Sequence, residues 1–152
     1  MNETVFLAVD KYSTLIFRIS FCHVKNKFDA EDVVQETFLS LLKAQPKIES
    51  EEHLKAWLIR VAINKCKNLH KATSRRKNVA FDEGLAASYN FDSNDIEMLD
   101  CLDRLKPLEK DILFLHYYEK YSAKEIGEIV GKKESAIFKK LQRTREKLKE
   151  FL

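Results

Sequence analysis

The chain has 152 residues, of which 45% are hydrophobic and 34% charged, a balance typical of a soluble protein with one domain or two small ones. Only 3 Gly and 2 Pro are present, which excludes collagen-like and Pro/Gly-rich disordered chains and disfavours many-stranded β folds. No apolar run is long enough for a membrane-spanning helix, and the N-terminus lacks the pattern of a secretory signal. We therefore expect no membrane insertion and a cytoplasmic location, with reduced cysteines.

Three amphipathic helices are predicted in the first half of the chain. Apolar residues at three- and four-residue spacing predict helices from about Glu3 to Val24, from Asp29 to Ala44, and from Glu51 to Thr73. We expect Asp29 to cap the second helix and Ser50 to cap the third. The apolar stripe expected to face the core from the third helix consists of Leu54, Trp57, Leu58, Val61, Ala62 and Leu69.

A linker is predicted between two small helical domains. The helical period fails within residues 76–94, where Gly, Ser and Asn are frequent. The sequence therefore predicts an all-α protein with domains at residues 1–75 and 95–152. The second domain should begin with a short helix from Ile96 to Leu105, and Pro107 suits the first position of the next helix.

The end of the chain has the pattern of a helix-turn-helix. Ser122 and Glu125 form a capping-box sequence, and Gly131 ends the helix that follows them. A last helix is predicted from about Glu134 to Glu150, with Ile137, Leu141 and Leu148 in the core. A short helix, a tight turn and a longer basic helix are typical of this DNA-binding motif.

Charge is strongly segregated along the chain. Residues 53–78 contain eight Lys/Arg and no Asp/Glu, whereas residues 79–103 contain seven Asp/Glu and no Lys/Arg. Eight cations without an anion repel one another unless a negative partner lies nearby. Nucleic acid is the leading candidate for that partner, and membrane phosphate is the second.

Two helices carry residues suited to nucleic acid. In the last helix, Ser135, Ala136 and Lys139 are placed to reach base edges while the remaining cations contact phosphates. The predicted duplex-binding set is Lys132, Lys133, Ser135, Ala136, Lys139, Lys140, Arg143 and Lys147. The third helix combines cations with Asn, whose amide both donates and accepts at a base edge. Its polar face consists of Arg60, Asn64, Lys67, Asn68 and Lys71. Trp57 suits stacking on an unpaired base, although its spacing from Leu54 favours core packing.

Three motifs in order resemble a known family. They are Asp29–Phe38 (DAEDVVQETF), Ala56–Asn64 (AWLIRVAIN) and the segment from Ser122 to Leu148. Together they resemble the small, two-domain, extracytoplasmic-function (ECF) class of bacterial RNA polymerase sigma factors.

The resemblance implies a function for each segment. The acidic second helix would bind the clamp of core RNA polymerase, the third helix would melt and read the minus-ten promoter element, and the last helix would bind the minus-thirty-five element. The loop Gln45–Ser50 would capture an extruded base, and the acidic linker would thread the polymerase channels. Further partners implied are the polymerase flap and, optionally, an anti-sigma protein. The implied polymerase-binding residues are Asp29, Asp32, Gln35 and Glu36. The implied minus-ten residues are Lys47, Trp57, Arg60, Asn64, Lys67, Asn68 and Lys71.

Three residues depart from the family pattern. Gly127 stands where the family usually has Ala, at a cost of about 1 kcal/mol inside a helix. Phe138 replaces a residue that is usually polar or basic, so the contacts to the minus-thirty-five element should differ. Ile59 replaces a common aromatic residue, which argues against base stacking at that position.

The sequence also bears on two other function classes. An enzyme is not expected, because no Gly-rich phosphate loop, HExxH or GxSxG motif occurs. We expect no metal and no cofactor, since Cys66 and His70 alone do not complete a zinc site. The alternative is a stand-alone helix-turn-helix regulator with an N-terminal helical interaction domain. Such a regulator has no need of the basic, Asn-bearing third helix.

Overall fold

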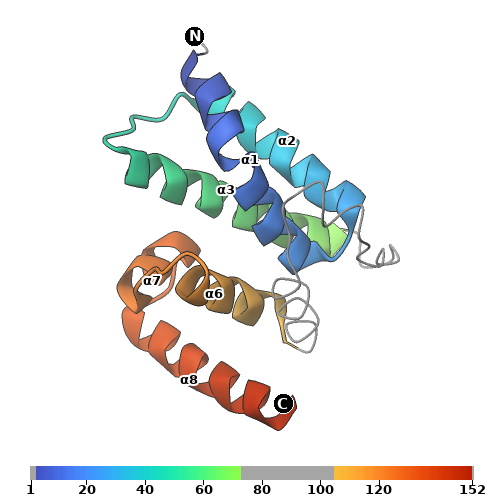
Figure 1. The fold of residues 1–152 in the computed structure, drawn as a ribbon, viewed down its shortest axis with the longest axis vertical. Coiled ribbons are helices and arrows are strands. Elements are labelled where there is room, and N and C mark those ends of the chain that lie inside the picture. Colours follow the sequence, from blue (N-terminus) through green and yellow to red (C-terminus); the bar gives the residue numbers. More distant parts are fainter. Residues whose placement is uncertain (1–2, 73–104, 152) are drawn as a thin grey trace. The chain divides into compact units, whose positions relative to one another are not determined.

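The computed structural model describes residues 3–72 and 105–151, which form helices and contain no strand. The chain divides into two compact units, Met1–Asn90 and Phe91–Leu152, whose helices are drawn in Figure 1. The all-α class and the two-domain layout are confirmed. The predicted linker and most of the predicted short helix from Ile96 to Leu105 lie outside the described residues. Within the described ranges, none of the helices has the length and apolarity needed to cross a bilayer.

The first unit is a bundle in which each helix packs on the other two. Its helices are α1 (Glu3–Val24), α2 (Lys27–Ala44) and α3 (Glu51–Ala72). The apolar period of each helix points large side chains inward, as expected for amphipathic helices. The largest of the fully buried side chains are Ile16, Phe17, Ile19, Phe21, Leu58, Ile59 and Ile63. Cys22 and Cys66 are also buried, as free thiols.

The start of α2 differs from the prediction. Asn26 is the N-cap, with φ −140°, and its side-chain oxygen accepts a hydrogen bond from the backbone N–H of Asp29 at 3.0 Å. Asp29 therefore lies in the first helical turn, where a carboxylate interacts favourably with the helix dipole. The prediction of Asp29 as the cap was wrong, because Asn26, three residues earlier, supplies the capping oxygen.

The core-facing side of α3 is also rotated from the predicted stripe. Ile59, Ile63 and Cys66 are buried, whereas Trp57 and Val61 are only half-buried. On a helix of 3.6 residues per turn, Trp57 falls on the side of Asn64 and not on the side of Leu58. Trp57 is therefore neither fully buried in the core nor fully exposed, and Ile59 is excluded from base stacking by its burial.

The second unit contains the predicted helix-turn-helix. Within residues 105–151, its helices are α6 (Pro107–Tyr117), α7 (Ala123–Val130) and α8 (Glu134–Phe151). The capping box of α7 is formed: the Ser122 Oγ accepts from the Glu125 N–H at 3.1 Å, and the Glu125 carboxylate accepts from the Ser122 N–H at 2.9 Å. Gly131 ends α7 in a left-handed conformation with φ 75°, which glycine adopts without steric cost. Ile126, Ile137 and Leu141 are buried between the helices.

The turn between α7 and α8 closes directly on Gly127. The backbone N–H groups of Gly131 and Lys132 both donate to the Gly127 carbonyl at 2.9 Å. A Cβ atom on Gly127 would lie 2.5 Å from the Lys132 carbonyl oxygen. The family departure at this position therefore has a packing reason, because the turn occupies the space that an alanine methyl group would need.

Candidate nucleic-acid interface

The outer face of α2 combines acidic and apolar side chains. Asp32, Gln35 and Glu36 are exposed, as predicted. Phe28 and Leu39 lie on the same side of the helix and are 63% and 44% exposed. Acidic groups repel nucleic acid, whereas exposed apolar residues among polar ones are typical of a protein-binding surface. This face is therefore suited to a protein partner.

Asp29 does not belong to that face. Its residue surface is only 4% exposed, so its carboxylate has too little accessible surface to contact a partner. The prediction of Asp29 as an interface residue is corrected for this physical reason. Glu36 remains accessible, although the Lys65 Nζ atom on α3 lies 3.7 Å from its carboxylate.

The outer face of α3 presents an aromatic, cationic and amide stripe. Trp57, Arg60, Asn64 and Asn68 follow one another at spacings of three and four residues, which places them on one side of the helix. Arg60, Asn64 and Asn68 are exposed and Trp57 is half-buried. The stripe offers one surface for stacking, one guanidinium and two amides, which are the groups that bind single-stranded nucleic acid. Lys67 is half-buried on the flank, and the side chain of Lys71 lies outside the described part of the chain.

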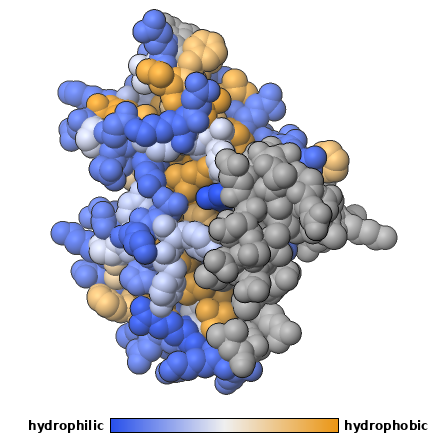
Figure 2. Space-filling view, in the orientation of Figure 1, coloured by the Kyte–Doolittle hydropathy of each residue, from blue (hydrophilic) through white to orange (hydrophobic). Residues whose placement is uncertain are grey.

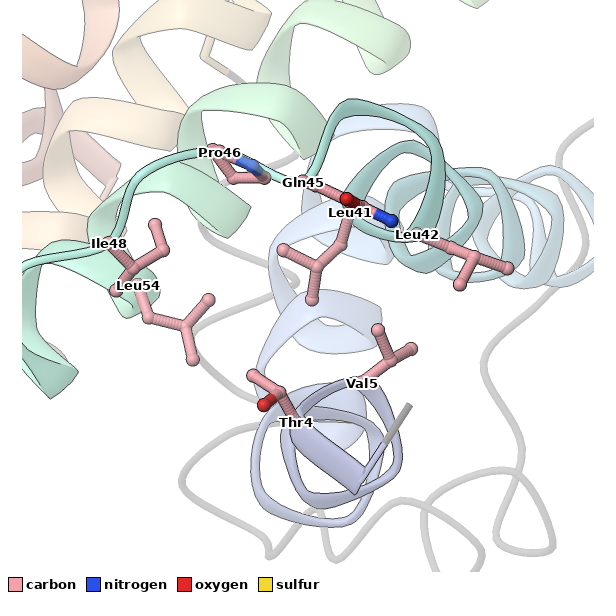
Figure 3. A pocket seen from close by; sticks show the side chains of 8 residues that line it. All are labelled: Thr4, Val5, Leu41, Leu42, Gln45, Pro46, Ile48 and Leu54. Atoms are coloured by element: carbon pink, nitrogen blue, oxygen red, sulfur yellow. The ribbon is translucent and has the colours of Figure 1, made fainter. Parts of the chain in front are cut away.

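The loop that joins α2 to α3 covers an apolar pocket of about 420 Å³. Gln45 begins the loop in a left-handed conformation, and Lys47 is exposed on it. Figure 3 shows Pro46 and Ile48 of the loop on one side of the space, with Thr4 and Val5 of α1 on the other. The pocket is lined by Thr4, Val5, Leu41, Leu42, Gln45, Pro46, Ile48 and Leu54. Its size lies within the usual range for small-ligand pockets.

A polar contact fixes the start of α3 against α1. The Tyr12 hydroxyl donates to the Glu51 carboxylate at 2.6 Å, and the Lys11 Nζ donates to the same oxygen at 3.2 Å. These two hydrogen bonds, that from Tyr12 first, lower the pKa of Glu51 below its ordinary value. Ser50 caps the same turn as predicted, because its Oγ accepts from the His53 N–H at 3.1 Å. The N-terminal end of α3 is thus held by side chains of α1 and by its own cap.

The outer face of α8 is polar and cationic. Ser135, Lys139 and Arg143 are exposed, opposite the buried Ile137 and Leu141. Lys132 and Lys133 are exposed in the preceding turn. A helix whose free side carries small polar groups near its start and cations along its length suits a major groove. The view in Figure 2 shows hydrophilic side chains over most of the described surface, with hydrophobic patches among them.

Three residues predicted for that face lie on its flank. Lys147 turns toward α6, where its Nζ donates to both carboxylate oxygens of Glu109 at 3.0 and 3.1 Å. Burial raises the pKa of Glu109, but hydrogen bonds from the Lys106 backbone and from Lys147 outweigh it and leave the pKa lowered. This ion pair competes with the DNA contact predicted for Lys147. Lys140 and Ala136 are half-buried on the same flank.

A second contact holds α8 to α6 from the other flank. The Arg145 Nε donates to the Tyr117 hydroxyl at 2.6 Å, and its guanidinium carbon lies 5.7 Å from the centre of the Tyr117 ring. Side-chain contacts therefore join α6 and α8 on both flanks of α8.

Sequence reasoning assigned no site role to four exposed residues. Phe28 and Leu39 on α2, and Phe138 and Gln142 on α8, all lie on outer faces. Apolar residues that fall off the core stripe of a helix are the signal that identifies Phe28 and Leu39. Phe138 was noted only as a departure from a family pattern.

Comparison with known families identifies the chain. Residues 8–76 match the family Sigma-70 region 2, and residues 95–148 match Sigma-70, region 4. The chain belongs to the sigma-70 family. It is a sigma factor of the ECF class, which binds core RNA polymerase and directs transcription initiation at promoters. Since both sigma-70 regions are present, the alternative of a stand-alone regulator is not favoured. The family consists of non-enzymatic initiation factors.

Two relatives show the same percentage of sequence identity to this sigma factor. RNA polymerase sigma factor SigV of Bacillus subtilis is 29% identical over 131 residues, which are 84% of this chain and 78% of SigV. The ECF RNA polymerase sigma factor BldN of Streptomyces coelicolor is 29% identical, over 84% of this chain and 52% of BldN.

A solved structure has the same fold. It is the sigma factor RpoE of Bartonella quintana in complex with the anti-sigma factor NepR, with a TM-score of 0.79. The match covers 97% of this chain and 96% of RpoE at 19% identity.

Proposed function

We propose that this sigma factor uses three separate outer faces to bind core polymerase, the minus-ten element and the minus-thirty-five element. The face of α2 formed by Asp32, Gln35 and Glu36 binds the polymerase clamp. The stripe of α3 binds the opened minus-ten element, and the outer face of α8 reads the minus-thirty-five element as duplex. The single observation that carries this assignment is the chemical difference between the faces: the α2 face is acidic and apolar, whereas the α3 and α8 faces are cationic.

The α3 stripe supports binding to an unpaired strand. Extruding a base from a duplex costs a few kcal/mol, which the protein must offset by stacking and hydrogen bonding. Asn64 and Asn68 offer amides that suit Watson–Crick edges, Trp57 offers a ring face, and Arg60 a charge for the backbone. We assign capture of an extruded base to the loop of residues 45–50. The pocket beneath this loop supports the assignment.

The α8 face supports duplex recognition. Exposed cations at Lys132, Lys133, Lys139 and Arg143 suit phosphates, and Ser135 suits a base edge. Lys140 and Ala136 contribute from the flank. We also propose that the second unit contacts the polymerase flap, that the chain acts in the cytoplasm, and that an anti-sigma protein regulates it. The fold match to RpoE, which was crystallised with an anti-sigma factor, supports the last of these.

The test of the division is association with core polymerase. Asp32→Lys with Glu36→Lys should abolish capture of the chain by immobilised core polymerase, because two acidic contacts become repulsive. The matched control is Asp10→Lys with Glu52→Lys, which makes the same charge change at two other exposed acids of the first unit. Far-ultraviolet circular dichroism should show that both variants are folded. Equal capture of both double variants would show that α2 is not the polymerase-binding face.

A further inference from the structure

An exposed aromatic residue lies on the outer face of α8. Phe138 is 60% exposed, although its neighbour Ile137 is fully buried. Ser135 and Gln142, three residues before it and four after it, are exposed as well. Residues at these spacings share one side of a helix. Phe138 therefore lies on the side of α8 assigned to duplex DNA, in the N-terminal half of the helix, where recognition helices contact bases.

Phe138 stands alone among polar residues. Of the α8 side chains that the structure describes, residues 134–150, it is the one exposed large hydrophobic residue. Its exposed neighbours at three- and four-residue spacing are Glu134, Ser135 and Gln142. A protein-docking surface groups several apolar residues together, whereas the major groove presents isolated apolar spots. Those spots are the C5-methyl groups of thymine, which aromatic and small apolar side chains contact.

We propose that Phe138 is a specificity-determining residue that packs against the C5-methyl group of a thymine in the upstream promoter element. The inference rests on the proposed role of α8 and adds to it the base class that this position selects. It also explains why an aromatic residue is tolerated on a cationic face: the side chain loses its contact with water when α8 enters the groove.

The test removes one methyl group from the DNA at a time. Holoenzyme assembled from core polymerase and the full chain is first used to map transcription start sites on genomic DNA, which defines the upstream element. Each thymine of that element is then replaced by deoxyuridine in a duplex fragment, and holoenzyme affinity is measured. At one thymine the wild-type protein should bind about fourfold more weakly, the equivalent of one buried methyl-sized group. At the other thymines, affinity should stay near that of the unmodified fragment.

Variants of the protein test the same contact from the protein side. Phe138→Ala should bind the unmodified fragment more weakly and should not distinguish thymine from deoxyuridine at that position. Phe138→Leu should keep part of the discrimination, because it keeps an apolar contact. Phe6→Ala removes another exposed phenyl ring, on α1, and should discriminate as the wild type does.

Three results would overturn the proposal, and they are distinguishable. If wild-type holoenzyme protects the upstream element but no deoxyuridine changes its affinity, Phe138 reads no methyl group while the role of α8 stands. If Phe138→Ala assembles poorly with core polymerase and keeps the deoxyuridine effect, Phe138 contacts protein. If wild-type holoenzyme leaves the upstream element unprotected, the proposed role of α8 fails and this inference fails with it.

Discussion

Replacing Gly127 by Ala separates two physical effects of opposite sign. Helix propensity alone predicts that alanine inside α7 stabilises the protein by about 1 kcal/mol. The structure predicts the reverse, because the new Cβ atom would lie 2.5 Å from the Lys132 carbonyl oxygen. That oxygen belongs to the backbone, so the conflict is relieved only if the turn between α7 and α8 moves.

The expected change in the free energy of unfolding combines the cost of overpacking with the gain in helix propensity. Overpacking of this kind costs typically 1–3 kcal/mol, and the turn is further held by the two hydrogen bonds to the Gly127 carbonyl. After the gain in helix propensity, we expect a net loss of about 1 kcal/mol. For a unit of this size, that loss lowers the melting temperature by roughly 4–8 °C. Moving the turn also displaces α8, so affinity for upstream duplex DNA should fall as well.

The assay uses the single tryptophan of the chain as an internal control. Trp57 lies in α3, so its fluorescence follows unfolding of the first unit, whereas circular dichroism at 222 nm follows helices of both units. Gly127→Ala should leave the Trp57 transition in place and shift the remaining helical transition downward. Glu128→Ala, at the next and exposed position of α7, should be neutral or slightly stabilising. A higher melting temperature for Gly127→Ala would refute the tight turn and leave propensity as the dominant effect.

Three further predictions concern Asn64 and the charged residues of α6 and α8. Asn64→Ala should leave polymerase binding intact but reduce open-complex formation in permanganate footprints. A template with a pre-melted minus-ten region should restore the activity of this variant. Normal opening of duplex DNA by the variant would remove Asn64 from the site. Lys139→Ala and Arg143→Ala should each reduce the slope of log affinity against log salt by about 0.9. Lys147→Ala should instead keep that slope and lower the stability of the second unit by about 1 kcal/mol. A reduced salt slope with unchanged stability would show that Lys147 contacts DNA. The folded-state pKa of Glu109 is lowered from its ordinary value of 4.5, so its ionised form stabilises the second unit above that pH. This contribution disappears as the pH falls through the folded-state pKa. Glu109→Gln should therefore flatten the dependence of the melting temperature on pH in that range.

Local signals in the sequence predicted most of the helices. The Ser122–Glu125 capping box and Gly131 depend on interactions within a few residues, so their positions follow from the chain alone. The cap of α2 was misplaced because Asn26 and Asp29 are both good capping residues. In the structure Asn26 supplies the capping oxygen, so Asp29 lies inside the first turn.

Long-range packing decided the features that the sequence did not predict. Periodicity shows that α8 has a polar side, but it does not show which flank of that side α6 covers. The contact between Lys147 and Glu109 was not predicted for that reason, since the two residues lie 38 positions apart in the sequence. On α3, periodicity did not show that Ile59 and Ile63 are buried while Trp57 and Val61 are only half-buried.

The most direct test of the account is transcription by core polymerase on genomic DNA, with 5′-end mapping of the transcripts. Wild-type chain should create start sites that core polymerase alone does not use, preceded by a common minus-ten and a common minus-thirty-five sequence. Asp32→Lys with Glu36→Lys should remove all of these sites, while the matched reversal at Asp10 and Glu52 should keep them. Start sites identical to those of core polymerase alone, or sites that survive the Asp32 and Glu36 reversal, would contradict the account.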